Sequence, residues 1–239
     1  MTSQISGQDL MIQRLPELRV GTNSTTHSAL HKVKFVGRLR AWDRFEQEAA
    51  VTFGAHYFKR LPLLGQRRND RINPLTREVY QVGDERDVQV RFGQNIGHIL
   101  SIIAEDERLG FKFAGARSVE LGAHDLSAAV RHFMGGRENY LRQILGQIAD
   151  YMDEFSMKYG VISTYNQSIF LRQRVDGGKW CLDYSPVINH DRSFRPTRRR
   201  LYPITTRQAF MHIAHLSSQG NVFDRGQSIT RNNRLWTQA

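Results

Sequence analysis

The strongest pattern along the chain is an apolar stripe at helical spacing over Arg137–Met157. Its members recur every three or four residues, as on one face of an α-helix: Leu141, Ile144, Leu145, Ile148, Tyr151, Met152 and Phe155. Gly160 follows shortly after as a helix stop signal. Weaker helical patterns cover Asp43–Phe53, Asp84–Glu107 (as one helix or two), Asp125–Met134 and Thr205–Ser217. The pattern therefore predicts several helices, with Arg137–Met157 the most strongly marked.

Three segments that follow this helix have the alternation and β-branched content of strands. They are Tyr159–Tyr165, Ser168–Val175 and Lys179–Tyr184, and Asp176-Gly177-Gly178 is a hairpin signal between the last two. Shorter extended segments are expected at Phe111–Phe113 and Ser118–Leu121. Strands that alternate with helices in this way predict an α/β or α+β fold with a central mixed sheet flanked by helices.

Polar composition marks both ends of the chain. Residues 1–28 are expected to form a loose or partly ordered, flexible leader, and residues 220–239 a polar tail. Residues 29–219 are then expected to form a single domain, in which residues 29–80 are a candidate helical cap. Within this cap, Leu61–Pro74 is rich in Pro, Gly, Asn and Asp and predicts a loop.

The 239-residue chain is strongly basic. It has 34 Lys and Arg against 23 Asp and Glu, a formal net charge of +11, and 28 of the 34 are arginine. A guanidinium group donates hydrogen bonds in a planar fork that matches phosphate and carboxylate oxygens. The charge therefore favours nucleic acid or another polyanion as a partner.

Several classes of protein are excluded or not supported. One cysteine, Cys181, excludes an internal disulfide framework and a cysteine-based zinc site. No apolar run approaches the roughly 18–20 residues of a membrane span. The first residues lack the pattern of a secretory signal, so an intracellular location, nucleus or cytoplasm, is expected. We find no phosphate-binding glycine loop and no catalytic-serine or zinc-protease motif, and His212 and His215 lack a third ligand nearby in sequence.

The C-terminal half resembles a known family. The segments that carry the resemblance are Gln147-Ile148-Ala149-Asp150-Tyr151-Met152, Tyr159-Gly160-Val161-Ile162-Ser163-Thr164-Tyr165, the apolar strand Ser168–Arg172, and Ser185-Pro186-Val187-Ile188. They resemble the PD-(D/E)XK nuclease-like domains of uncharacterised fungal proteins, over about Arg117–Leu216. The resemblance implies a restriction-endonuclease-like core and, in active members, Mg²⁺- or Mn²⁺-dependent hydrolysis of phosphodiesters.

The family's acidic residues hold the metal ions, and its motif lysine stabilises charge at the reacting phosphate. Glu120 falls on the family's second acid, but Gly122 stands where the lysine belongs, and the upstream Pro-Asp is missing. The resemblance makes Glu120 a catalytic and metal-binding candidate. Lys112 is a candidate substitute for the lysine.

Two further acids are candidate metal ligands. Asp106, between Glu105 and Glu107, is the nearest upstream acid, and Glu85 resembles the helix acid that some members add to the site. The alternative for each is an ordinary acid at a helix end. Gln147, four residues before Tyr151 and therefore on the same helix face, is a candidate catalytic residue, and Tyr151 belongs to the core stripe.

Candidate contacts to nucleic acid are Arg172, on the second predicted strand, and the cluster Arg198, Arg199 and Arg200. That cluster is equally interpretable as a nuclear import signal or a solvated loop. Three hypotheses follow. The first is a nuclease-fold, nucleic-acid-binding protein whose catalytic motif is degenerate. The second is an active, metal-dependent nuclease. The third is a non-enzymatic scaffold that binds an acidic protein partner.

Overall fold

The structure is a computed structural model, and it describes residues 5–20, 33–56, 58, 62–64, 81–82, 85–109, 125–194, 203–223 and 236–238. The chain forms two compact units. Unit 1 comprises Met1–Thr25, Arg44–Arg117 and Ile188–Ser218, and unit 2 comprises Thr26–Asp43, Ser118–Val187 and Gln219–Ala239. The candidate cap, residues 29–80, is thus divided between them at Asp43 and Arg44.

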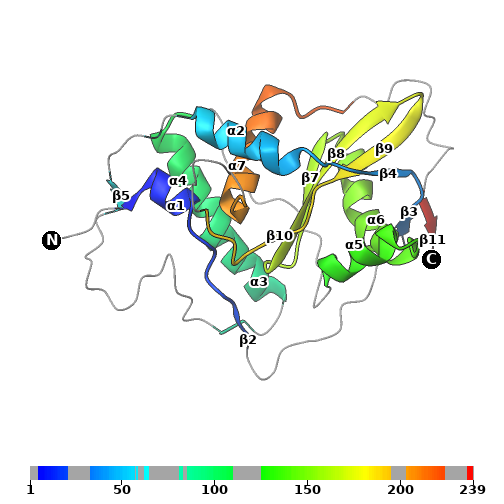
Figure 1. Cartoon of the computed structure of the whole chain (residues 1–239), viewed down its shortest axis with the longest axis horizontal. Coiled ribbons are helices and arrows are strands. Elements are labelled where there is room, and N and C mark those ends of the chain that lie inside the picture. Colours follow the sequence, from blue (N-terminus) through cyan, green and yellow to red (C-terminus); the bar gives the residue numbers. More distant parts are fainter. Residues whose placement is uncertain are drawn as a thin grey trace. The chain divides into compact units, whose positions relative to one another are not determined.

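Unit 2 is built on a mixed sheet. Its strands lie in the order β7 (Tyr159–Ser163), β8 (Gln167–Asp176), β9 (Lys179–Tyr184) and β4 (Arg38–Ala41). β8 pairs antiparallel with both β7 and β9, whereas β4 runs parallel to β9. Figure 1 shows the β8–β9 hairpin with β4 alongside β9. The mixed sheet and the three C-terminal strands predicted from sequence are confirmed.

The hairpin turn between β8 and β9 follows from its two glycines. Gly177 and Gly178 have φ values of 58° and 70°. Two successive residues at positive φ define the tight turn whose twist matches that of antiparallel strands, and only glycine adopts it without steric cost. The turn fixes the register that sets Asp176 opposite Lys179.

Two helices pack against one face of this sheet. They are α5 (Leu126–Met134) and α6 (Asn139–Glu154), which match the predicted Asp125–Met134 and Arg137–Met157 apart from their ends. Their apolar stripes join the inward residues of the strands in one buried cluster, which includes Leu145, Ile162, Leu171 and Leu182. Phe35, from β3 (Val33–Phe35), completes it with an edge-on contact to the Trp180 ring. The strand β3 itself pairs with β11 (Trp236–Gln238).

Unit 1 is mainly helical. Its helices are α1 (Gly7–Met11), α2 (Phe45–Ala55), α3 (Glu85–Phe92), the π-helix η1 (Gly93–His98), α4 (Ile99–Asp106) and α7 (Thr206–Gln219). Its strands are β1 (Ile5–Ser6) with β5 (Pro62–Leu64), β2 (Arg19–Val20) with β6 (Gln81–Val82), and the short β10 (Ile188–Asn189). The α2 and α7 helices confirm the predictions for Asp43–Phe53 and Thr205–Ser217.

The sequence predicts either one helix or two over Asp84–Glu107, and the structure has one long helical run there. The segments α3, η1 and α4 follow one another without a break, and Figure 1 shows α3 and α4 as the two ends of one run. The π-helical turns begin at Gly93 and include Gly97. Glycine lowers helix stability, and a π turn releases backbone groups from the regular ladder. The run is therefore one helix with a local change of winding.

Part of the expected leader is ordered. Ser6 and Asp9 form a reciprocal capping box at the start of α1, and Leu10, Met11 and Leu15 are buried. The predicted loop Leu61–Pro74 needs a correction at Pro62–Leu64, which pairs with β1. A pairing partner nearly 60 residues away leaves no local signal.

The expected strands Phe111–Phe113 and Ser118–Leu121 lie outside the described residues. No helix in the described part of the chain is long and apolar enough to cross a membrane.

Candidate nucleic-acid interface

The sheet face of unit 2 that lies opposite α5 and α6 carries four arginines. Register places Arg40, Asp183 and Arg172 side by side across β4, β9 and β8, and Arg38, Cys181 and Arg174 in the next row. Alternation along a strand puts residues two apart on one face. We call the surface formed by Arg38, Arg40, Arg172, Arg174, Asp176 and Asp183 the arginine face.

Asp183 holds two of these arginines. Its side chain is only 3% exposed. Arg172 donates from Nε and Nη2 to Oδ2, at 3.2 and 2.9 Å, and Arg174 donates from Nε to Oδ1 at 3.0 Å. The hydrogen bond to Asp183 raises the pKa of Arg174, and the negative charges of Asp183 and Asp176 act in the same direction. The hydrogen bonds to Asp183 thereby fix the orientation of both guanidinium groups.

Asp176, at the end of β8, contacts the outer arginines. Its Oδ2 accepts from Arg40 Nη1 at 3.1 Å and from Arg38 Nη1 at 3.5 Å, and it lies 3.6 Å from Arg174 Nη2. The side chains of Arg38 and Arg40 are 47% and 52% exposed. Four arginines against two aspartates leave a local charge of +2, and Arg38 and Arg40 present most of it to solvent.

An aromatic pair lies beside the arginine face. The Arg172 guanidinium carbon is 4.0 Å from the centroid of the Trp42 ring, a cation–π contact. Trp42 stacks in turn on Tyr159, with centroids 6.5 Å apart and planes inclined by 24°. The backbone N–H of Trp42 donates to the carbonyl of Tyr184 at 2.7 Å, which continues the pairing of β4 with β9. Trp42 is buried and thus supports Arg172 from beneath.

The predicted pair on α6 is present but lies at the edge of the core. Gln147 Nε2 donates to the Tyr151 hydroxyl at 3.2 Å, which confirms that both point the same way. Tyr151 packs against the buried cluster of unit 2, and both side chains are half-buried. An amide bonded to a core tyrosine in this way is consistent with a boundary role, and no described acid joins it.

Two proposed metal ligands cannot share an ion. Glu85 begins α3 and Asp106 ends α4, so about 21 helical residues, or roughly 30 Å of helix, separate them. Glu120 and Lys112 lie outside the described residues, as does the Arg198–Arg200 cluster. Among the residues that the structure describes, no three His, Cys, Asp or Glu side chains come close enough to hold a metal.

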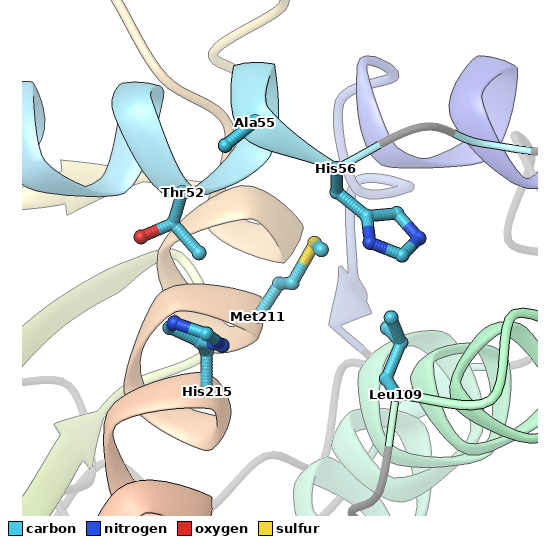
Figure 2. Close-up of a pocket in the computed structure, with 6 residues that line it drawn as sticks. All are labelled: Thr52, Ala55, His56, Leu109, Met211 and His215. Carbon is cyan, nitrogen blue, oxygen red and sulfur yellow. The ribbon is translucent and has the colours of Figure 1, made fainter.

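His212 and His215 lie in unit 1, where both contact neighbouring helix residues and have a packing role. His212 is buried, its Nδ1 is 2.8 Å from Thr52 Oγ1, and its ring meets Phe45 edge-on. His215 lines a pocket of about 150 Å³, together with Thr52, Ala55, His56, Leu109 and Met211. Figure 2 shows Met211 in the middle of this group, between the two histidine rings.

Two short motifs in the sequence carry a signal for the arginine face. Arg38-Leu39-Arg40 and Arg172-Gln173-Arg174 are both Arg-x-Arg tripeptides, and in a strand each places its two arginines on one face. Of these four arginines, only Arg172 is predicted from the sequence as a contact, because the strand Arg38–Ala41 is not predicted. No local pattern in the predicted strand Lys179–Tyr184 marks Asp183 as the partner of Arg172 and Arg174.

Comparison with protein-family models, with curated proteins and with solved structures finds no match to this chain. The resemblance to PD-(D/E)XK nuclease-like domains therefore remains a prediction from the residues of the C-terminal half. The geometry of the arginine face is independent of it.

Proposed function

We propose that this protein binds nucleic acid through the arginine face, on a nuclease-like fold whose catalytic motif is degenerate. The observation that carries the proposal is the pair of arginine rows fixed by Asp183 and Asp176, with Arg38 and Arg40 about half-exposed. Ordered, surplus guanidinium groups on one face of a sheet can donate hydrogen bonds to the oxygens of successive phosphates. The formal net charge of +11 adds long-range attraction to a polyanion.

The catalytic part of the proposal rests on sequence. Gly122 replaces the motif lysine, and loss of one group that stabilises the reacting charge commonly lowers the rate by about 10²–10³. If cleavage survives, Mg²⁺ or Mn²⁺ is the expected cofactor and Glu120 its expected ligand.

The test is fluorescence anisotropy with labelled 20-mers of single- and double-stranded DNA and RNA, over a salt series. The double variant Arg38→Gln/Arg40→Gln removes the two exposed arginines. The matched control Arg131→Gln/Arg137→Gln removes two exposed arginines of unit 2 that lie on α5 and just after it. Each phosphate contact contributes about 0.7–0.9 to the slope of log K against log salt. We therefore expect the first variant to lower that slope by about 1.4–1.8 and the control to leave it nearly unchanged.

Equal effects of the two variants would show that binding is diffuse and would contradict the assignment to the arginine face. The same mixtures with Mg²⁺ or Mn²⁺ report cleavage. Cleavage that disappears in Glu120→Ala would replace the binding-only proposal with an active nuclease. Binding of a polyglutamate probe, with no binding of any nucleic acid, would favour an acidic protein partner.

A further inference from the structure

The arginines of the arginine face differ in which atoms of the guanidinium group remain available to a ligand. Arg172 uses both Nε and Nη2 on Asp183, so the edge of its guanidinium that best clamps a phosphate is already occupied. One flat side of the same group lies on Trp42. The side chain is 30% exposed, and neither of its hydrogen bonds to Asp183 uses the Nη1 group.

Arg38 and Arg40 are arranged differently. Each reaches Asp176 through Nη1 alone and is about half-exposed, so its Nε and Nη2 remain available to an incoming phosphate. The strands β4 and β8 are separated by β9, so Arg40 and Arg172 in one row lie about 10 Å apart. A short stretch of one nucleic-acid strand can reach both.

From this difference between Arg172 and the outer arginines, we infer that the ligand of the arginine face is a single strand of nucleic acid. One of its bases stacks on the Arg172 guanidinium, while Arg38 and Arg40 contact its phosphates. The inference rests on the proposed function and adds its substrate class. A base can present its flat side to a protein only when it is unstacked from its neighbours, which favours a single strand over a duplex. A planar group held on one side by Trp42 and on one edge by Asp183 is already oriented for such a contact.

The first test uses the wild-type protein, so it does not depend on any variant folding. Three labelled 15-mers are compared by anisotropy at one salt concentration: a mixed-sequence single strand, its duplex, and a single strand of the same length with abasic sites at every position. Stacking of one base is worth a factor of about five or more in affinity. We expect the base-containing single strand to bind at least about fivefold more tightly than either the duplex or the abasic strand.

The second test separates stacking from charge. Arg172→Lys keeps the positive charge near Asp183 but removes the flat group on Trp42. Arg174→Lys is the matched control, because Arg174 also pairs with Asp183 and has no contact with the Trp42 ring among the described interactions. We expect Arg172→Lys to lose at least about fivefold on the base-containing strand and less than twofold on the abasic strand, and Arg174→Lys to change both equally.

The outcomes distinguish failure of this inference from failure of the proposed function. Equal binding of single strand, duplex and abasic strand, or equal effects of the two lysine variants, overturns base stacking and leaves phosphate binding intact. Absence of binding to all three probes overturns both. Tight binding of a polyglutamate peptide in place of the oligonucleotides identifies an acidic protein as the partner and also overturns both.

Discussion

Asp183 determines the conformation of two arginines at once. It lies in the middle strand of the arginine face, is 3% exposed, and accepts three hydrogen bonds from Arg172 and Arg174. A buried carboxylate is tolerated because its charge and lone pairs are matched in this way. The same residue therefore stabilises unit 2 and orients the groups that we propose to contact nucleic acid.

Replacing Asp183 with Asn is expected to destabilise the protein by roughly 2–3 kcal/mol, because two partly buried guanidinium groups lose their counter-charge. The control Asp176→Asn removes a carboxylate that is 39% exposed and should cost less than about 1 kcal/mol. Urea unfolding followed by far-UV circular dichroism measures both. Similar midpoints for the two variants would contradict the structural role of Asp183.

Arg207 is a second buried charge, in unit 1. Its side chain is fully buried, and it donates from Nε to the Asn95 carbonyl and from Nη1 to the Leu10 carbonyl, both at 3.0 Å. Asn95 lies in the π-helix, and Leu10 lies in the last turn of α1. Both are places where helix carbonyls lack a regular partner, so one guanidinium stabilises two irregular helix segments.

We expect Arg207→Met to lower the free energy of unfolding by about 3 kcal/mol or more, since it leaves two buried carbonyls without these donors. Arg207→Lys keeps the charge but cannot point donors in both directions, so it should recover only part of the loss. Urea denaturation measures the three proteins. A methionine variant as stable as the wild type would show that solvent or backbone rearrangement satisfies these carbonyls.

At the scale of elements, the start of α5 shows how a strand can stabilise a helix. Asp125 Oδ1 accepts from the Ala128 N–H at 3.0 Å, and Gln167 Oε1, at the start of β8, accepts from the Leu126 N–H at 2.7 Å. The hydrogen bond from Ala128 lowers the pKa of Asp125, and Gln167 and Arg131 add to the effect. The first turn of α5 is thus capped by its own aspartate and by a neighbouring strand.

Asp125→Ala is expected to cost about 1 kcal/mol at neutral pH, the usual value of an N-cap. Because the folded state lowers the pKa of Asp125, this contribution is complete above the unfolded carboxyl pKa of about 3.9 and disappears as pH falls through the lower folded value. The difference in stability between wild type and variant should therefore shrink below about pH 4. Thermal unfolding at several pH values tests this, with Asp150→Ala, an exposed mid-helix acid, as the control.

Local sequence patterns predicted the elements whose stabilising interactions lie within a few residues of one another. The helices α5 and α6 and the β8–β9 hairpin follow from apolar periodicity, Asp125 and the Gly177-Gly178 turn, all of which act over a few residues. The strand β4 was missed because Arg38–Ala41 is only four residues long and its partner β9 lies about 140 residues away. The arginine face was missed with it, since its two rows exist only when β4 lies beside β9.

At the scale of the whole molecule, the chain order and the compact units do not coincide. Each unit is assembled from three separate segments, and the sheet of unit 2 takes β4 from residues before Asp43 and its other strands from residues after Ser118. The interleaving depends on contacts between segments that lie far apart in the sequence, and no local pattern marks such contacts. The sequence therefore predicted a single domain over residues 29–219. The interleaving also means that neither unit can be obtained by a single cut.

We therefore expect a fragment of residues 118–239 not to fold cooperatively, because it lacks β4 and also lacks Phe35, which is fully buried in the core of unit 2. Residues 26–43, appended through a flexible linker, should restore a cooperative thermal transition by circular dichroism. The same appended segment with Phe35→Ala is the control. It should restore much less stability, since truncating a buried phenylalanine costs about 3–5 kcal/mol. A cooperative transition in the fragment alone would show that β7, β8 and β9 with α5 and α6 suffice, and that β4 joins a sheet that has already formed.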